Sequence, residues 1–273
     1  DRVVGNPKTF AKGAKILQID VDPAEINKNI LTSASIIGDI REVLKRLNKK
    51  LDRLNHKEWV DRVMELKSKY PLHYQQAKLC GPEIVEKIYE ITRGNAIICT
   101  EVGQHQMWAA QYVKQTSPQN FLSSGGLGTM GFGYGAAIGA QMGNPDKRVI
   151  HLTGDGSLHM NLAEACTAVS NNLPIITVIF NNRVLGMVYQ WQTAFYGKRY
   201  SQTTPERKTD FAKLIEAFGG NGFRADTMEE FKEAFEKALS LDGPTWIDCS
   251  IAMYDKVLPM IPNGKTIDDM LFE

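Results

Sequence analysis

The feature that most constrains the fold is a strand-turn-helix-strand pattern in the middle of the chain. The apolar run at residues 148–152 predicts a buried strand, which the Gly-Asp-Gly-Ser turn at residues 154–157 ends. A helical pattern follows, and the β-branched run at residues 175–180 predicts a second strand that Asn181 and Asn182 close. This order is a βαβ unit, and it predicts an α/β protein with a parallel sheet.

Polar residues directly follow both predicted strands. Because parallel strands end at the same edge of a sheet, we expect Asp155 and Asn182 to lie side by side. A carboxylate and an amide oxygen suit a hard divalent cation such as Mg²⁺. Gly154 and Gly156 would let the backbone approach a bulky anion, and the next helix would offer free N–H groups to phosphate. The pattern favours a Mg²⁺–diphosphate site over two turns that merely end strands.

A third strand is predicted at residues 96–99, and it would place Gln104 and His105 at the same edge. Both side chains can donate hydrogen bonds to a diphosphate. The alternative is that they belong to an ordinary surface loop. Their position beside Asp155 favours the diphosphate.

Two local patterns carry further expectations. Asn161 and Glu164 have the spacing of a capping box that begins the helix after the Gly-Asp-Gly turn. Glycines recur at every fourth position, which predicts a helix packed very closely on a neighbour. These glycines are Gly131, Gly135, Gly139 and Gly143.

The stretch at residues 126–131 matches GxGxxG and could be read as a dinucleotide-binding fingerprint. That fingerprint needs a firm strand before it and an acid at the end of the next strand. Here the preceding strand is short, and Asp146 stands before its strand instead of after it. The pattern disfavours a dinucleotide but does not exclude an NAD-binding oxidoreductase.

Long motifs around these residues resemble a known family. Gly-Asp-Gly followed by Asn-Asn at this distance resembles the motif of thiamine-diphosphate-dependent enzymes. Within them, GQHQMWAAQ at 103–111, SGGLGTMG at 124–131 and GMVYQWQ at 186–192 are similar to the acetohydroxyacid synthase (acetolactate synthase) catalytic subunits. The similarity covers nearly the whole chain. It implies a doubly wound parallel sheet with helices on both faces, preceded by the end of a second α/β domain.

The resemblance also implies cofactors and a set of site residues. The metal ligands would be Asp155, Asn182 and the backbone carbonyl of Val184, and Met130 would hold thiamine diphosphate in its bent shape. Trp191 and Met187 would shape the pocket of the second substrate. The remaining cofactor contacts would be Val102, Gly103, Gln104, His105, Gly128, Gly154, Gly156, Ser157, Leu185, Gly186, Met187 and Val188.

The implied reaction is decarboxylation of pyruvate and ligation to a second 2-oxo acid, either pyruvate or 2-oxobutyrate. The product is 2-acetolactate or 2-aceto-2-hydroxybutyrate, in branched-chain amino acid biosynthesis. Family members act as homodimers or tetramers, with a small regulatory subunit as a further candidate partner. Other thiamine-dependent decarboxylases or oxidases, and a non-catalytic binding module with the same fold, remain alternatives.

The family's activating glutamate comes from an N-terminal domain of the partner subunit, and this chain has no match to that domain. Glu101 and Glu164 lie near the predicted site, but neither fits the motif. We therefore expect the chain alone to bind Mg²⁺–thiamine diphosphate weakly and not to catalyse the reaction.

Four segments are predicted along the chain. Residues 1–45 resemble the end of the family's central domain, where Asp20, Val21, Asp39 and Ile40 would lie near FAD in the intact protein. The alternative is that both acids only cap strand ends. Residues 46–80 read as a helical linker, 81–258 as the thiamine-diphosphate domain, and 259–273 as a C-terminal tail.

Composition excludes some classes of function. The net charge of +1 gives no electrostatic reason to expect nucleic acid, and no apolar run reaches the ~20 residues of a membrane span. The chain begins Asp1-Arg2 without a signal peptide, so we expect a part of a longer protein. Cys99, Cys166 and Cys249 read as buried thiols, which favours a cytoplasmic location, or a plastid if the source is a plant.

Overall fold

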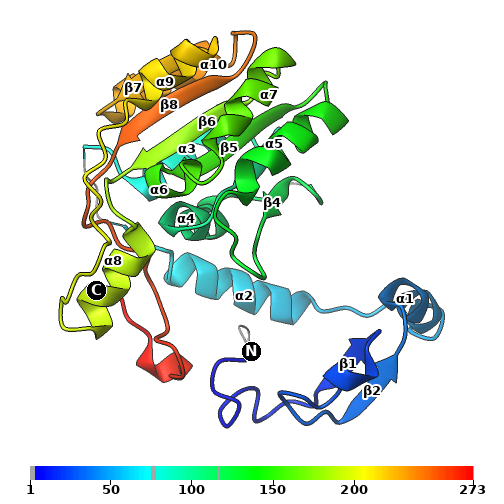
Figure 1. Ribbon diagram of the computed structural model, residues 1–273. Helices are drawn as coiled ribbons and strands as arrows, with labels where there is room; N and C mark the ends of the chain where they lie inside the picture. The colour runs from blue at the N-terminus through cyan, green and yellow to red at the C-terminus, as the bar shows by residue number, and fades with distance from the viewer. Residues whose placement is uncertain (1–3, 75–77, 116, 273) are drawn as a thin grey trace. The chain divides into compact units, whose positions relative to one another are not determined.

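The computed structural model describes residues 4–74, 78–115 and 117–272, and it divides the chain into two compact units (Figure 1). Tyr74–Val257 form one unit, and Asp1–His73 together with Leu258–Glu273 form the other. The four predicted segment limits differ from this division and stay a prediction. None of the described helices is long and apolar enough to cross a membrane.

The described part of the larger unit is built on a parallel sheet with the strand order β4-β3-β5-β6-β8-β7. Its strands are β3 (Ala96–Thr100), β4 (Phe121–Ser123), β5 (Arg148–Gly154), β6 (Ile176–Asn181), β7 (Asn221–Ala225) and β8 (Thr245–Ser250). The predicted α/β class and parallel sheet are confirmed.

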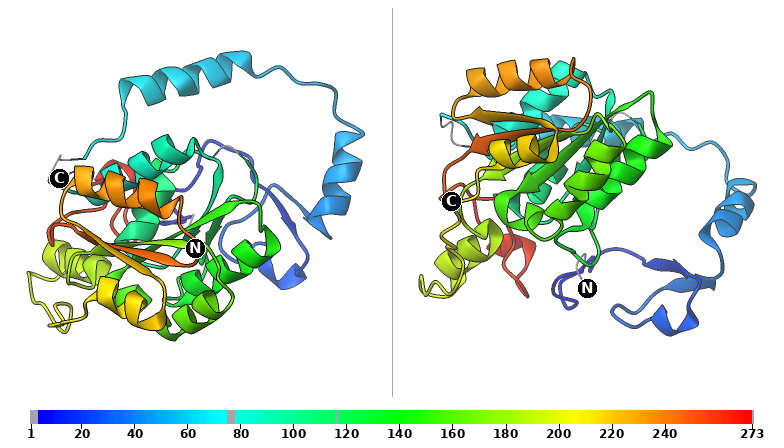
Figure 2. Two further views of the ribbon diagram at one scale, coloured as in Figure 1. Left: turned by 90° about the horizontal axis from the view of Figure 1, so that it is seen from above. Right: turned by 45° about the horizontal axis from the view of Figure 1, so that its top comes forward.

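Helices cover both faces of this sheet (Figure 2). One face carries α3 (Gly81–Thr92), α4 (Gln104–Tyr112) and α10 (Met228–Ala238). The other carries α5 (Phe132–Gly143), α6 (Asp155–Leu158), α7 (Ala165–Ser170) and α9 (Phe211–Phe218). The helical segments η2 (Leu162–Glu164) and α8 (Gly186–Phe195) complete the described elements of this unit.

The sheet has a hydrophobic core on each face because successive side chains of a strand point to opposite sides. Ile98 and Ile150 belong to one core, whereas their neighbours Ile97 and Val149 belong to the other. This double burial explains why the central strands read as continuous apolar runs. Trp108 and Trp246, both fully buried, anchor the two cores.

The chain reverses its direction across the sheet between β3 and β5. β3 leads into α4 on one face, while β5 leads into α6 and α7 on the other. The loops at the carboxyl ends of β3 and β5 therefore diverge and leave a crevice. Ligands of open α/β sheets bind at such a switch point.

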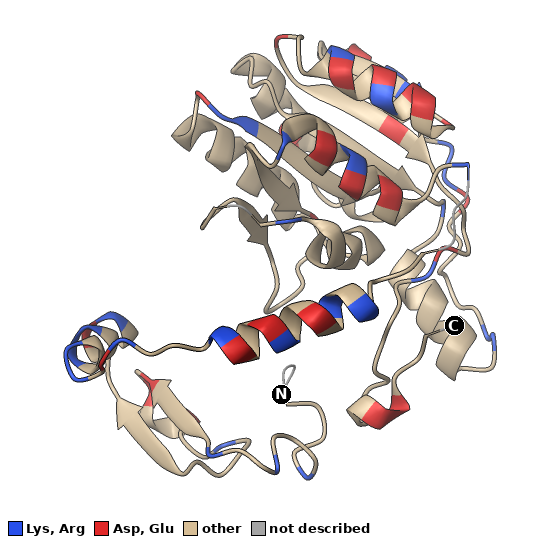
Figure 3. Ribbon diagram, turned by 180° about the vertical axis from the view of Figure 1, so that it is seen from behind, with Lys and Arg blue, Asp and Glu red and all other residues tan. Residues whose placement is uncertain are grey.

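The described part of the smaller unit holds a two-stranded parallel sheet of β1 (Leu17–Asp20) and β2 (Ala34–Ile37). Charges of both signs alternate along its longer helix, α2 at Lys57–Lys69 (Figure 3). The other elements are η1 (Pro23–Glu25), α1 (Ile40–Asn48), α2 (Lys57–Lys69) and η3 (Ile267–Asp269).

Three local predictions are wrong. Asn161 makes no helix-capping bond, and its amide nitrogen donates instead to the Gly131 carbonyl at 3.2 Å. Cys166 is exposed rather than buried. Three of the four glycines predicted to pack closely do not, since a Cβ at Gly135, Gly139 or Gly143 would meet no described atom within 4 Å, whereas a Cβ at Gly131 would lie 3.2 Å from the Met160 Cβ.

The close approach of α5 occurs instead at Gly133. A Cβ there would lie 2.7 Å from the backbone nitrogen of Glu101 and 2.8 Å from the Thr100 carbonyl oxygen. Only glycine lets the first turn of α5 pack directly on the end of β3. The start of α5 is thereby fixed beside the switch point.

Candidate functional site

Three loops at the carboxyl ends of neighbouring strands enclose a pocket at the switch point. They are residues 102–105 after β3, 154–157 after β5 and 182–188 after β6. The pocket holds ≈ 510 Å³, part of it open to solvent, which is within the range of small-molecule sites. Its lining includes every cofactor-contacting residue predicted from the sequence except Gly128.

Asp155 and Asn182 both line this pocket, although they are far apart in the sequence. The pairing of β5 with β6 places Gly154 opposite Phe180, so the residues that follow emerge at one edge. Asp155 is 2 % exposed and Asn182 is 7 % exposed. A buried carboxylate and a buried amide oxygen can ligate a cation, but their role as ligands stays a prediction.

Asp155 already has a cationic partner in the chain. Arg207 donates from Nη1 to the Asp155 carboxylate at 2.6 Å. Burial raises the pKa of Asp155, and the charge and hydrogen bond of Arg207 oppose that shift. A cation at this carboxylate therefore favours its ionised form.

The turn after β6 places the third predicted ligand. The Asn182 side-chain oxygen accepts a hydrogen bond from the Val184 backbone nitrogen at 3.2 Å. Arg183 between them adopts a left-handed conformation with φ of 63°. Such a conformation is unfavourable for a residue other than glycine, and it folds the chain back so that Asn182 and Val184 both line the pocket.

His105 has an unused ring nitrogen in the pocket. Its Nε2 is buried and has no hydrogen-bond partner among the residues that the structure describes. Burial lowers the pKa of His105 to about 3, so its ring is neutral at physiological pH. An unpartnered buried polar atom costs free energy, which a ligand in this pocket could recover.

The side chain of Gln104 already uses both of its polar atoms in hydrogen bonds within the protein. Its amide nitrogen donates to the Gln190 side chain at 2.9 Å and to the Asp255 carbonyl at 2.8 Å. Its oxygen accepts a hydrogen bond from Asn182 at 3.1 Å. In this arrangement, Gln104 orients Asn182 and ties the loop after β8 to the pocket, so a bond from Gln104 to diphosphate stays a prediction.

Glu101, which directly follows β3, links two of the segments around the pocket by hydrogen bonds. It is fully buried and accepts hydrogen bonds from the Gly131 nitrogen at 2.6 Å, the Tyr134 nitrogen at 3.1 Å and the Ser157 hydroxyl at 2.8 Å. Burial opposes its ionisation, but interactions with His151, Ser157 and Gly131 prevail and lower the pKa of Glu101. A charged carboxylate therefore secures the start of α5 and the loop after β5.

Met130 lies immediately before this secured turn and lines the pocket. Gly128 does not line it, but its φ of 74° requires glycine in the same loop. A Cβ on Gly128 would lie 3.8 Å from a methyl group of Val102, which is itself a lining residue.

The glycines of the pocket are set by close packing between loops. A Cβ at Gly154 would lie 3.0 Å from His105 Nδ1, and a Cβ at Gly156 would lie 2.8 Å from a Leu185 methyl group. Gly186 is tighter still, since its Cβ would lie 2.0 Å from the Gln104 side-chain oxygen. The two glycines beside Asp155 therefore also let the three loops pack closely on one another.

A second hollow adjoins the first along α8. Met187 and Val188 line both, and Trp191 and Tyr196 line only the second. The Trp191 ring packs edge-on against Phe195 with centroids 5.6 Å apart. The predicted substrate-pocket residues are therefore next to the predicted cofactor pocket.

The four residues predicted for FAD lie in the smaller unit. Asp20 accepts a hydrogen bond from the Asp22 nitrogen at 3.0 Å, and Asp39 caps α1 by accepting from the nitrogens of Arg41 and Glu42. Val21 and Ile40 are exposed. These bonds match the capping alternative, and FAD binding here stays a prediction.

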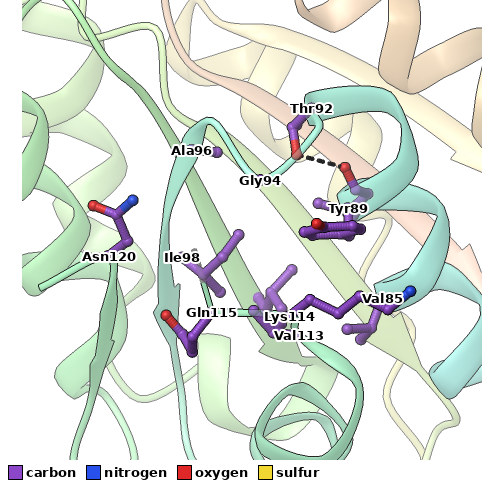
Figure 4. A pocket seen from close by; sticks show the side chains of 12 residues that line it. Val85, Tyr89, Thr92, Gly94, Ala96, Ile98, Val113, Lys114, Gln115 and Asn120 are labelled. Carbon is purple, nitrogen blue, oxygen red and sulfur yellow. Dashed lines mark hydrogen bonds between the residues drawn. The ribbon is translucent and has the colours of Figure 1, made fainter. Parts of the chain in front are cut away.

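Another hollow lies beside the amino end of β3, away from the three loops (Figure 4). Ile98, Val85 and Val113 give it an apolar wall, and Lys114 is the only charged residue among its described lining residues. Tyr89, Thr92, Gln115 and Asn120 add neutral polar groups to it. These lining residues include no carboxylate and no imidazole, whereas the pocket at the switch point contains both.

The residues at the switch point fit a metal–diphosphate group. Two buried side-chain oxygens, an unpartnered imidazole nitrogen and glycine-lined backbone converge there. Family comparison agrees with this chemistry, since residues 101–249 match the family described as "Thiamine pyrophosphate enzyme, C-terminal TPP binding domain". The chain belongs to the thiamine pyrophosphate enzymes. Residues 1–47 match the "Thiamine pyrophosphate enzyme, central domain". Thiamine pyrophosphate, also called thiamine diphosphate, is the cofactor of this domain.

Within this family, the chain is similar to proteins named acetolactate synthases. The chain is 40 % identical to the probable acetolactate synthase large subunit of Methanococcus aeolicus, with 99 % of the chain and 48 % of the relative covered. It is 40 % identical to acetolactate synthase 1, chloroplastic, of Nicotiana tabacum, with 100 % and 43 % covered. It is 37 % identical to the acetolactate synthase isozyme 2 large subunit of Escherichia coli, with 99 % and 49 % covered. The chain thus spans about half the length of these relatives.

Sequence reasoning missed several residues of the site. Trp108 and Phe180 line the pocket, but Phe180 ends an apolar run that reads as core, and Trp108 lies in the motif at 103–111 without a predicted role of its own. Glu101 lies near the predicted site in the sequence, but no motif marks it as the group that holds the turn before α5. Arg207 was not identified at all, because a single arginine in a charged loop gives no signal without the fold.

Proposed function

We propose that this chain supplies the diphosphate- and Mg²⁺-binding half of an acetolactate synthase active site. The intact protein would decarboxylate pyruvate and join the remaining two-carbon unit to a second 2-oxo acid, giving 2-acetolactate or 2-aceto-2-hydroxybutyrate. Identity near 40 % over essentially the whole chain to several acetolactate synthases supports this proposal.

One structural observation carries the proposal. Asp155 and Asn182 follow adjacent parallel strands and line the same pocket at the switch point of the sheet. The glycines flanking Asp155 and the unpartnered His105 nitrogen belong to the same pocket. This combination suits an anionic diphosphate held through a divalent cation.

Each residue then has a role. Asp155, Asn182 and the Val184 carbonyl would hold Mg²⁺, and His105 would donate a hydrogen bond to the diphosphate. Met130 would support the cofactor from the turn that Glu101 secures, while Trp191 and Met187 would shape the substrate pocket. Thiamine diphosphate supplies an electron sink for decarboxylation when bound. The protein supplies orientation, charge and exclusion of water.

Other parts of the active site would come from outside this chain. We expect the activating glutamate from the partner subunit of a homodimer or tetramer, FAD at Asp20, Val21, Asp39 and Ile40, and a small subunit as a regulatory partner. The name "large subunit" given to two of the relatives supports a second subunit type. A cytoplasmic location, or a plastid in a plant, follows from the same proposal.

Cofactor binding tests the proposal. Thiamine diphosphate should quench the tryptophan fluorescence of the chain in the presence of Mg²⁺ but not in EDTA, because Trp108 lines the pocket. Asp155→Asn should weaken this binding at least about 100-fold, since a charged metal ligand is lost. Asp146→Asn, in the loop before β5, is the matched control and should bind as the wild type does.

The contrary results are specific. Binding of NADH without any response to thiamine diphosphate would favour the dinucleotide alternative instead. Equal binding of thiamine diphosphate by the wild type and Asp155→Asn would contradict the proposal that Asp155 is a metal ligand. Acetolactate formation by the 273-residue chain alone would contradict the expectation that a partner supplies the activating glutamate.

A further inference from the structure

The metal site already contains a cation that belongs to the chain. Arg207 lies 52 residues after Asp155 and donates to its carboxylate at 2.6 Å. The Asp155 side chain is 3 % exposed and the Arg207 side chain is 21 % exposed, so the pair is largely removed from water. A buried carboxylate needs such a partner, because an uncompensated buried charge is strongly unfavourable.

Arg207 is held in place by the loop around it. On one side, the Leu185 nitrogen donates to the Thr203 carbonyl at 2.8 Å. On the other side, His159 contacts Thr209 through Nε2 at 2.9 Å and the Asp155 carbonyl through Nδ1 at 2.6 Å. Because a carbonyl only accepts, His159 Nδ1 donates to the Asp155 carbonyl.

These anchors leave the guanidinium directly over the Gly-Asp-Gly turn. A Cβ on Gly156 would lie 3.3 Å from Arg207 Nη2 and 3.5 Å from Nη1. Arg207 therefore contacts both the Asp155 carboxylate and the Gly156 backbone position of this turn.

A metal ion and Arg207 compete for the same carboxylate. Mg²⁺ requires close, nearly octahedral oxygen ligands, and a guanidinium on the same carboxylate would lie beside it in a site with little water to screen their repulsion. The form that can bind metal is then only a fraction of the metal-free protein. The apparent affinity for metal falls by that fraction.

We propose that Arg207 is a built-in counter-ion that occupies the Asp155 carboxylate in the metal-free chain and sets the Mg²⁺ concentration at which the cofactor binds. This inference rests on the proposed function and extends it to a residue outside the three loops. Arg207 stabilises the empty site and must leave it when Mg²⁺ enters. Its removal should therefore strengthen metal binding.

The experiment is a Mg²⁺ titration at a fixed excess of thiamine diphosphate, followed by tryptophan fluorescence. Arg207→Ala and Arg207→Met should reach half-saturation at about tenfold lower Mg²⁺ than the wild type, as expected if about a tenth of the wild type is free to bind metal. Lys208→Ala removes the same charge from an exposed neighbour and should leave the midpoint unchanged.

Thermal unfolding gives a second readout that is independent of the cofactor. In EDTA, both Arg207 variants should unfold at a lower temperature than the wild type, because Asp155 is then buried without a partner. With Mg²⁺ and thiamine diphosphate, this difference should shrink, since the metal replaces Arg207. Arg207→Met keeps most of the side-chain volume and separates the effect of charge from that of packing.

Two results would overturn the inference. An unchanged or higher Mg²⁺ midpoint in both Arg207 variants would show that Arg207 does not compete with the metal. In that case, normal binding by the wild type would leave the proposed function intact. A wild type that binds no thiamine diphosphate at any Mg²⁺ concentration would instead remove the proposed function and this inference together.

Discussion

Asp155 and His105 define the site at the scale of single residues, and both are buried polar groups with unusual surroundings. Asp155 depends on Arg207 for compensation, and His105 Nε2 has no hydrogen-bond partner among the described residues. Proteins rarely bury polar groups this way outside functional sites. Motifs could identify both residues, but only coordinates could show what they contact.

His105 should make the free chain sensitive to acid. Its pKa is about 6.5 when unfolded and about 3 when folded, so between these values the unfolded state binds more protons. The contribution of His105 to the unfolding free energy is therefore fully present above pH 6.5 and is lost as the pH falls toward 3. We expect His105 to account for about 3 kcal/mol of the loss in unfolding free energy by pH 4.

Urea denaturation at several pH values checks this expectation. His105→Gln cannot titrate, so its unfolding free energy should fall less steeply below pH 6.5 than that of the wild type. His56→Gln changes an exposed histidine and should follow the wild type. Parallel pH profiles for the wild type and His105→Gln would show that His105 does not remain neutral in the fold.

Helix α5 shows, at the scale of elements, how far a sequence pattern can be trusted. The glycines at every fourth position predict close packing, yet the tightest contact is at Gly133, outside that series, and within the series only Gly131 meets a described neighbour. Helical periodicity identifies which residues share a face but not which face meets a neighbour. Here Glu101 decides the orientation by accepting bonds from the first residues of α5.

A pair of glycine substitutions tests this orientation. Gly133→Ala would push a methyl group against the Glu101 backbone and should lower the unfolding free energy by about 2 kcal/mol or more. Gly139→Ala meets nothing within 4 Å and should raise it by about 0.5–1 kcal/mol through better helix propensity. Chemical denaturation measures both, and the opposite ranking would mean that the other face of α5 contacts the sheet.

Some elements carry strong end signals in the sequence. Pro82 lies in the first turn of α3, and Gly219 follows α9 in the left-handed conformation, the positions that each residue favours. Thr227 and Glu230 have the spacing of a capping box, and Thr227 caps α10 by accepting from the Glu230 nitrogen at 3.2 Å. The segment after the Gly-Asp-Gly turn was predicted less well, because it is divided among α6, η2 and α7 with contacts to α5 replacing the expected cap.

The whole larger unit follows from one property, which is that its central strands are buried on both faces. Continuous apolar strands separated by helices require a parallel sheet, and a parallel sheet has a shared edge for polar loops. The fold class and the meeting of three loops could therefore be predicted from the sequence. Arg207, the bonds of Gln104 and the network of Glu101 could not, because they depend on distances between loops that no spacing encodes.

The central claim is that Asp155 and Asn182 hold one divalent cation between them. Anomalous scattering from a crystal grown with Mn²⁺ and thiamine diphosphate measures this most directly. A single strong manganese peak should lie between the two side-chain oxygens, with Arg207 withdrawn from Asp155. A peak elsewhere, or cofactor bound while Asp155 remains paired with Arg207, would contradict the account.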